Sequence, residues 1–433
     1  MDLIYPNKTI KVNKIDYIFY FLVIIFLGSA MLLTRNSLEA FGGSDIITLF
    51  GKICMLFYAI YLFHKHGYRF QTSIPWNIVL ILFVWAILQV IKYHTVSAYF
   101  LIRLMNILFA VVIIKVYGTK SIYLFEYVVS KLSVISLFGW GLVLVFPDLM
   151  LELSKLSPIE SYGLVENGSF FVFGISDSSE IVRRNLGFAW EPGRFGSILS
   201  IGLFFNLIVY DFKLKKNRHF WYIVLAILSS QSTTAYMGLI FVLSFYVYNK
   251  KRKFLYKMLP IFIIGFFCLI QLDFMGEKIQ SLWLTEEHAI EWERQLNYYI
   301  TQDNVVVPQR FDGLFYEFLN ILHDPLIGNA SDETSYLTSL FGIKFSLSNG
   351  CLRIFANMGI VMGILYYILL YKSSVHFSRI YQFKGKLAWF FLFLLINISY
   401  SWIFEPVFLA IILLFLYHKP ENFSTVQKQL IVQ

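Results

Sequence analysis

The chain has 433 residues and a net charge of +9, and 58% of its residues are hydrophobic, 19% aromatic and only 15% charged. A soluble globular protein carries roughly a quarter of its residues as Asp, Glu, Lys and Arg, and single cores stop growing near about 250–300 residues. The composition therefore excludes a soluble globular fold. The positive charge lies mostly in loops that we expect to be cytoplasmic, so membrane topology explains it better than binding to nucleic acid does.

Apolar runs recur along the chain near the length of about 20 residues that a helix needs to cross a bilayer. We therefore predict one transmembrane domain over residues 1–433, an all-α polytopic integral membrane protein with about twelve transmembrane helices. The predicted spans are 16–33, 46–63, 74–91, 98–116, 121–146, 186–209, 219–230, 235–248, 254–271, 349–371, 387–402 and 403–417.

Basic stretches predict the orientation, because short cytoplasmic loops carry an excess of Lys and Arg. These stretches are Lys8, Lys11 and Lys14, then 211–219, 249–254 and 372–386. If all of them are cytoplasmic, the span count places both termini in the cytoplasm. The first apolar run lacks a small-residue cleavage site, so we interpret it as a retained span and not as a signal peptide.

The two spans between the basic loops 211–219 and 249–254 are short. Each limb is too short to cross the full bilayer, so the polar stretch SSQSTT (229–234) is predicted to turn within the outer part of the membrane. A turn in hydrocarbon must be surrounded by protein or water. We expect this turn to be buried against other helices and to line a cavity; the alternative is a purely structural turn.

Two external regions are predicted, a loop over 147–185 and a large loop over 272–348 between the ninth and tenth spans. Within the large loop, 276–300 is expected to form a helix on the membrane surface. Apolar residues at three- and four-residue spacing predict an amphipathic helix over 310–322, which Pro325 and Gly328 then end. Such a cap favours a catalyst working at the membrane face.

Six cationic residues do not follow the rule that Lys and Arg collect on the cytoplasmic side, because the predicted spans place them in or just above the outer third of the membrane. They are Lys52, Arg103, Arg184, Arg194, Arg310 and Arg353. Intramembrane cations are costly and usually face a cavity or a partner, and Glu191 and Glu405 are the clearest acidic partners. The surplus indicates an anion, and arginine suits phosphate because its planar fork binds bidentately. The alternative is that side chains such as Lys52 and Arg353 reach the interface from the lipid.

The stretch RRNLGFAWEPGRFG (183–196) has the highest density of candidate site residues. Its glycines, together with Pro192, are expected to let the backbone bend and to let neighbouring helices approach. Glu191 and Arg194 lie three apart, so on a helix they share a face. They form either a structural ion pair or a site in which Glu191 is a general base, with Trp190 among the substrate-binding residues.

Several of these motifs carry a family resemblance. The pattern R-x-x-G-x-x-x-E-P-x-x-x-G, which begins at Arg184, resembles the bacterial O-antigen polymerase and ligase superfamily, especially the repeat-unit polymerases (Wzy). QSTTAY (231–236) is similar to their Ser/Thr-rich motif. The stretches 310–330 and 348–365 resemble their large external loop and the span that follows it.

The resemblance implies a metal-independent, cofactor-free inverting glycosyltransferase, with a membrane fold like that of other GT-C-type enzymes, at the outer face of the bacterial cytoplasmic (inner) membrane. The donor would be a glycan on undecaprenyl pyrophosphate, the acceptor a lipid-linked repeat unit, and the product an O-antigen or capsule polysaccharide. Membrane lipid surrounds the protein, and the sequence leaves open whether a separate protein regulates chain length.

The implied roles follow this chemistry. The catalytic residues would be Glu191 as base, with Arg184 and Arg310 holding the pyrophosphate. Arg103, Arg194, Arg353, Ser232, Thr233 and Trp190 would bind substrate.

The chain departs from the ligases of the superfamily. SLSNGC (346–351) lacks the histidine of their His-Asn pair, which favours a polymerase over a ligase. Glu39 and Asp45 in the first external loop are poorly spaced for a divalent metal. A lipid-linked oligosaccharide flippase is the main alternative outside the enzymes, but transporters commonly contain repeated halves, and we find no internal repeat.

Overall fold

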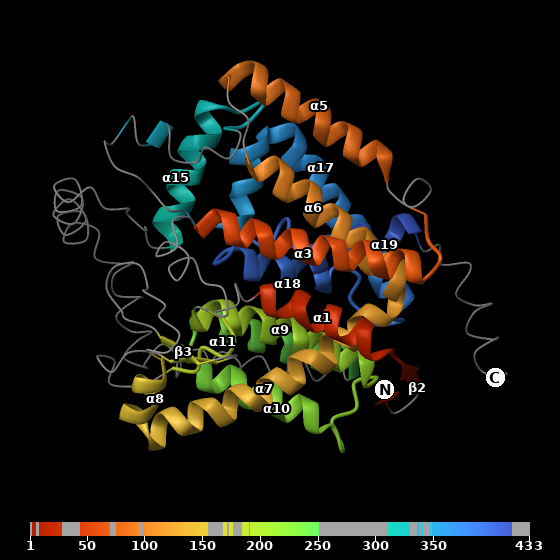
Figure 1. Ribbon diagram of the computed structural model, residues 1–433, viewed down its shortest axis with the longest axis vertical. Helices are drawn as coiled ribbons and strands as arrows, with labels where there is room; N and C mark the ends of the chain where they lie inside the picture. The colour runs from red at the N-terminus through yellow and green to blue at the C-terminus, as the bar shows by residue number, and fades with distance from the viewer. Residues whose placement is uncertain are drawn as a thin grey trace.

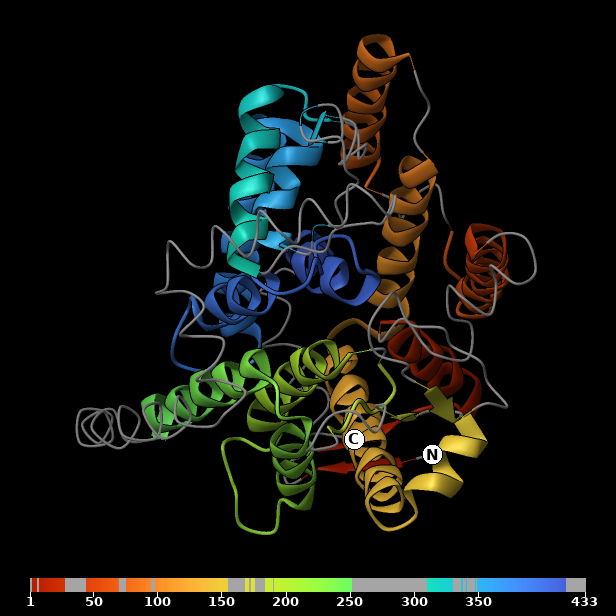
Figure 2. The same cartoon turned by 90° about the vertical axis from the view of Figure 1, so that its left-hand side faces the viewer.

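The computed structural model describes residues 2–5, 8–27, 44–69, 75–94, 98–154, 168–170, 173–175, 184–189, 191–250, 310–329, 336–337, 340, 347 and 349–417. These residues are mostly helical (Figures 1 and 2). Among them, four segments are long and apolar enough to cross a membrane: Trp76–Tyr93, Arg103–Val145, Pro192–Val209 and Gly350–Ile380. The protein is therefore a helical, membrane-embedded protein.

The helices follow one another in chain order with two small hairpins. They are α1 (Lys14–Leu27), α3 (Ser44–Lys65), α5 (Trp76–Tyr93), α6 (Ala98–Val112), α7 (Ser121–Val145), α8 (Pro147–Ser154), α9 (Pro192–Val209), α10 (Arg218–Ser230), α11 (Thr233–Lys250), α15 (Arg310–His323), α17 (Gly350–Ile380), α18 (Ala388–Asn397) and α19 (Pro406–Tyr417). Strands β1 (Asp2–Tyr5) and β2 (Lys8–Lys11) pair antiparallel, as do β3 (Gly168–Phe170) and β4 (Phe173–Ile175). A π-helical turn and a 3-10 turn, 113–120, join α6 to α7.

Every predicted span that falls within the described residues coincides with a helix; the span 254–271 and the surface helix over 276–300 lie outside them. Three predicted boundaries are wrong. Helix α17 ends at Ile380 and not at 371, so it extends into the predicted basic loop 372–386. Helix α9 begins at Pro192 and not near 186, because the chain turns at Gly187, whose φ is +55°. Helix α18 ends at Asn397 and not at 402, because the Asn397 side-chain oxygen accepts a bond from the Trp402 amide at 2.9 Å and holds a non-helical turn.

Helix α9 forms the centre of one half of the molecule and packs against α7, α10 and α11 (Figure 1). Its apolar side chains are buried all round, which is typical of a helix enclosed by other helices. Phe204 and Phe205 continue this core toward Phe377 and Trp389, whose rings they contact.

The basic stretches meet at one end of the molecule. Strand β1 reaches α7 and the end of α9, because the Tyr5 ring contacts the rings of Tyr123 and Tyr210. Lys250 Nζ donates to the Asp211 carbonyl at 3.2 Å, and the Lys384 amide donates to the Asn249 side chain at 2.7 Å. We call this end, formed by residues 2–5, 8–14, 210–219, 249–250 and 381–384, the basic end.

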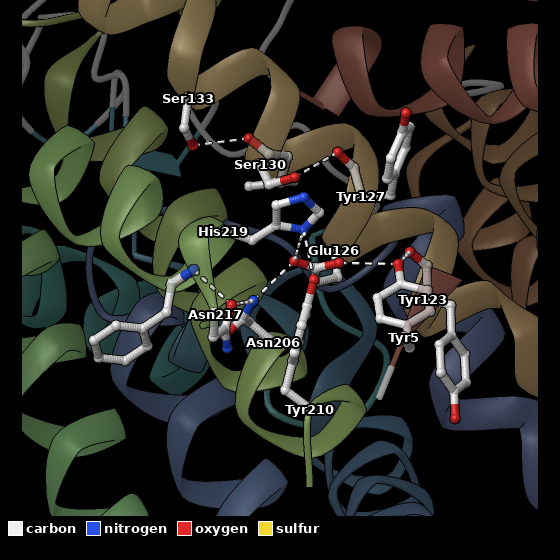
Figure 3. A network of polar contacts seen from close by, with 12 residues as sticks. Tyr5, Tyr123, Glu126, Tyr127, Ser130, Ser133, Asn206, Tyr210, Asn217 and His219 are labelled. Atoms are coloured by element: carbon white, nitrogen blue, oxygen red, sulfur yellow. Dashed lines mark hydrogen bonds and ion pairs between the residues drawn. The ribbon is translucent and has the colours of Figure 1, made fainter. Parts of the chain in front are cut away.

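A buried polar network holds the basic end together (Figure 3). Its centre is the fully buried carboxylate of Glu126 on α7. This carboxylate accepts bonds from the Tyr5 hydroxyl at 2.9 Å and from Asn206 Nδ2 at 2.8 Å, and it lies 2.9 Å from His219 Nδ1. Burial, with the neighbouring Glu126 carboxylate, raises the pKa of Tyr5, so the phenol keeps its proton and donates.

We expect Glu126→Ala to destabilise the protein by about 2–5 kcal/mol, because it removes the carboxylate that the buried Tyr5 and Asn206 side chains and the partly buried His219 share. Thermal unfolding of the detergent-purified protein measures this. Asp148→Asn, at an exposed carboxylate of α8, is the matched control and should leave the melting temperature unchanged. Equal melting of both variants would show that the network contributes nothing.

The opposite end contains the predicted polar turn between α10 and α11. Ser229, Ser230, Ser232 and Thr234 are all buried there. The Asn185 amide donates to the Ser229 carbonyl at 3.0 Å, and its side chain donates to the Ser229 hydroxyl at 2.9 Å. The predicted burial of the turn is therefore confirmed, although the 184–189 segment that covers it is not a helix.

Helix α17 contains a break at Gly359, where φ is +77° and ψ is 170°. The turn after α15, residues 324–329, fills this break. The Asn329 amide donates to the Ala356 carbonyl at 2.8 Å, and the Ile360 amide donates to the Pro325 carbonyl at 2.7 Å. The inserted turn thus supplies hydrogen bonds at the place where the helical ladder is interrupted.

Helix α5 clamps the same turn from the other side. Gln89, which is buried, donates to the carbonyls of Ile327 at 2.9 Å and of Asn357 at 2.8 Å, and so joins the turn to α17. Lys92 and Tyr93 both bind the Asp324 carboxylate. The end of α15 is therefore held between α5 and α17.

Candidate active site

A non-helical loop between α18 and α19, residues 398–405, lies at the end opposite the basic end and organises the candidate site. The Thr234 and Ser399 hydroxyls lie 2.7 Å apart and tie this loop to the start of α11. The Asn349 side chain donates to the Ile398 carbonyl at 3.0 Å and ties it to the start of α17. The loop therefore contacts the start of α11 and the start of α17.

Arg194, in the first turn of α9, points onto this loop. Its guanidinium lies 4.4 Å from the Trp402 ring centre and 3.6 Å from Glu405 Oε1. The Arg194 side chain is only 12% exposed, whereas that of Glu405 is 28% exposed. The predicted pairing of a membrane arginine with Glu405 is confirmed, and the cation is held between a carboxylate and an aromatic face.

Arg103, on α6, reaches the same loop from the other side. Its guanidinium lies 4.9 Å from the centre of the Phe404 ring. It also lines a small pocket between α5, α6 and α17, next to Gln89 and Met358. Arg103 and Arg194, which lie 91 positions apart in the sequence, thus contact the same loop, residues 402–405.

Glu191 precedes α9 in an extended conformation, with φ −144° and ψ 141°. It therefore does not share a helical face with Arg194, and that expectation is wrong. Its carboxylate still acts electrostatically on Arg194, together with Glu405 and Tyr400. Glu191 therefore lies within electrostatic range of Arg194, but it precedes α9 in an extended conformation and is not part of the helix.

Arg184 and the serine-threonine turn lie beside this site. Arg184 is partly exposed and acts electrostatically on Tyr236 of α11. Ser232 is buried, and no hydrogen-bond partner for its hydroxyl is found among the described residues. Thr233 is half-buried at the start of α11.

Close packing of α9 and α11 brings these groups together. A Cβ atom at Gly196 would lie 2.3 Å from the Ala235 Cβ, so only glycine permits this approach. The expectation that glycines near 183–196 bring helices close is confirmed at this position. The same contact sets how closely the first turns of α9 and α11 approach each other.

The remaining predicted residues are more peripheral or fall outside the described part of the chain. Arg353 Nη1 donates to the Leu347 carbonyl at 2.9 Å, near the start of α17. Arg310 is the first residue of α15, and its side chain lies outside the described atoms, as do Trp190 and the side chain of Lys52.

Helix α15 contains a carboxylate that the sequence analysis did not single out. Glu317 is fully buried, and Tyr316 and Asn320 are buried on the same helix. Buried carboxylates are rare unless they interact with other groups. In the sequence, Glu317 is only an acidic residue within a predicted amphipathic helix of the large loop. A solvated glutamate gives the same pattern, so its burial could not be predicted.

The arrangement offers guanidinium groups, a nearby carboxylate and buried hydroxyls at one end of a membrane-embedded bundle. Guanidinium groups of this kind can hold a phosphate or diphosphate, and a carboxylate can accept a hydroxyl proton. Within the described residues, no three His, Cys, Asp or Glu side chains are arranged to hold a metal ion.

Comparisons with models of known protein families, with curated proteins and with solved structures give no match.

Proposed function

We propose that this protein is a polysaccharide polymerase of the cytoplasmic membrane of bacteria. It would join oligosaccharide repeat units linked to undecaprenyl pyrophosphate, as in O-antigen or capsule synthesis. The observation that supports this proposal best is that Arg103 lies on Phe404, in the 402–405 loop at the end opposite the basic end, whose Trp402 and Glu405 hold Arg194. The Arg103 cation at that position suits a diphosphate group carried by a lipid.

The proposal includes the finer topology. About twelve spans would place the basic end and both termini in the cytoplasm, and the candidate site at the outer face. The loops 147–185 and 272–348 would then be external, and the second would cover the site.

The reaction would be a single displacement at the anomeric carbon of the donor sugar. The acceptor hydroxyl oxygen forms the new glycosidic bond, and the bond from the anomeric carbon to the diphosphate oxygen breaks. The hydroxyl proton passes to the Glu191 carboxylate. The bonding electrons leave with undecaprenyl pyrophosphate, whose growing charge Arg103, Arg184 and Arg310 stabilise.

Arg194 has a different role in this scheme, because Glu405 already pairs with it. It would position the 402–405 residues and orient Glu191 by electrostatic attraction. Ser232 and Thr233 would donate hydrogen bonds to sugar or phosphate oxygens.

Glu191→Gln and Arg310→Ala should each abolish chain extension by the purified protein supplied with lipid-linked repeat units, because the first removes the base and the second a phosphate ligand. Gel electrophoresis of the glycan products measures this. Asp148→Asn and Arg218→Ala, which change exposed residues of the same types, are the controls.

Unchanged polymer length in the folded Glu191→Gln and Arg310→Ala variants would remove the catalytic assignment. Transfer of glycan to a lipid A core acceptor would identify a ligase instead. Accumulation of repeat units on the inner face after inactivation would identify a flippase.

A further inference from the structure

Helix α15 presents three large apolar side chains outward and buries a carboxylate and an amide on its inner face, beside Tyr316 and Ile321. Phe315, Phe318 and Leu322 are 58%, 50% and 60% exposed, whereas Glu317 and Asn320 are 0% and 1% exposed. A helix that covers a site in water has the opposite arrangement, with its apolar stripe against the protein and charges outside. The environment around the outer face of α15 is therefore apolar.

The outward stripe continues onto a second element. Residues 315, 318 and 322 lie three and four positions apart, and Leu326 follows at the next step, 68% exposed. Leu326 lies against the break in α17, where its carbonyl oxygen would be 2.0 Å from a Cβ placed on Gly359.

Beyond the break, α17 exposes an apolar stripe of its own. Its exposed residues are Ile360, Val361, Ile364, Leu365, Ile368 and Tyr371. Helices α15 and α17 lie side by side in both views (Figures 1 and 2). One continuous apolar surface thus runs from α15 onto a helix that is long enough to cross the membrane.

The position of α15 is fixed and does not depend on the surface itself. The turn that follows it is bonded into α17, and Asp324 is held by Lys92 and Tyr93 of α5. Because these contacts determine which way α15 faces, the outward stripe cannot rotate toward the protein without breaking them.

We propose that α15 lies in the membrane, with Phe315, Phe318 and Leu322 in contact with the hydrocarbon of the lipid bilayer. Its polar face, which contains Glu317 and Asn320, is then the inner wall of the protein at this end. This conclusion differs from a water-exposed cap, and it does not depend on the proposed enzymatic activity. Backbone groups permit it, because a helix satisfies its own hydrogen bonds in lipid.

Spin-label accessibility tests the proposal directly. A cysteine-free full-length chain with Phe318→Cys or Leu322→Cys is labelled with a nitroxide and reconstituted into phosphatidylethanolamine and phosphatidylglycerol vesicles. Molecular oxygen partitions into lipid, and nickel-EDDA remains in water, so the ratio of their collision rates reports the solvent at each site. Ile364→Cys on α17 is the control for lipid and Lys215→Cys at the basic end is the control for water.

We expect labels at 318 and 322 to show the excess of oxygen over nickel-EDDA that Ile364 shows, and the reverse of the ratio at Lys215. Higher accessibility to nickel-EDDA would place α15 in water and overturn the proposal. Low accessibility to both reagents would also overturn it, because a protein partner or a second copy of the chain would then cover the stripe. Monodisperse elution of each labelled protein shows that it has folded.

Discussion

Arg103→Ala is expected to lower the rate of chain extension about 10²–10³-fold, the usual effect of removing one group that stabilises charge in a transition state. The protein should remain folded, because the Arg103 side chain is only partly buried and its cation–π contact with the Phe404 ring contributes about 0.5–2 kcal/mol. Turnover of purified protein at saturating lipid-linked substrate measures the first effect, and thermal unfolding measures the second.

Arg194→Ala provides the contrast. Its side chain is almost enclosed, and its loss leaves Glu405 and the Trp402 ring without their cation. We expect this variant to melt at a lower temperature than Arg103→Ala. Arg218→Ala, at an exposed arginine of the basic end, should change neither quantity. Full activity of Arg103→Ala would exclude Arg103 from the site.

Gly359→Ala is expected to give the largest loss of stability, about 2–6 kcal/mol, from backbone strain and overpacking together. The φ and ψ at this position suit glycine alone, and a Cβ atom would lie 2.0 Å from the Leu326 carbonyl oxygen. The 324–329 turn would be expelled from the break in α17. Thermal unfolding would measure the loss of stability. Limited proteolysis in the region that follows residue 310 would report the expulsion of the turn.

Gly141→Ala is the matched control, because it lies within helix α7 and a Cβ there meets nothing within 4 Å. It should be neutral or stabilise by up to about 1 kcal/mol. If Gly359→Ala and Gly141→Ala have the same melting temperature, the inserted turn does not hold α17 in its broken form.

Helix positions could be predicted from the sequence because each apolar run specifies a helix in a bilayer. The break at Gly359 could not, since it depends on the 324–329 turn, about 30 residues earlier, which replaces helical hydrogen bonds. The early end of α18 could not be predicted either, because Trp402 and Phe404 are apolar and hydropathy does not distinguish them from a helix that continues. The late start of α9 depends on the turn at Gly187, which hydropathy does not show.

The residue types of the candidate site could be predicted from the sequence, but most of its geometry could not. The excess of arginines and the scarcity of acidic partners were visible in the sequence, and Glu405 does pair with Arg194. That pairing joins α9 to a loop some 200 residues later, and no local pattern encodes it. Periodicity likewise identified α15 as amphipathic, but not that its polar face, with Glu317, is the buried one.

The most direct test of the enzymatic proposal is to count the products of the reaction. The wild-type protein in vesicles receives a defined undecaprenyl-pyrophosphate-linked oligosaccharide, and mass spectrometry quantifies glycan and free undecaprenyl pyrophosphate. The proposal predicts glycans longer by whole repeat units, with one undecaprenyl pyrophosphate released for each new glycosidic bond. Movement of intact substrate across the bilayer with no bond formed would contradict it.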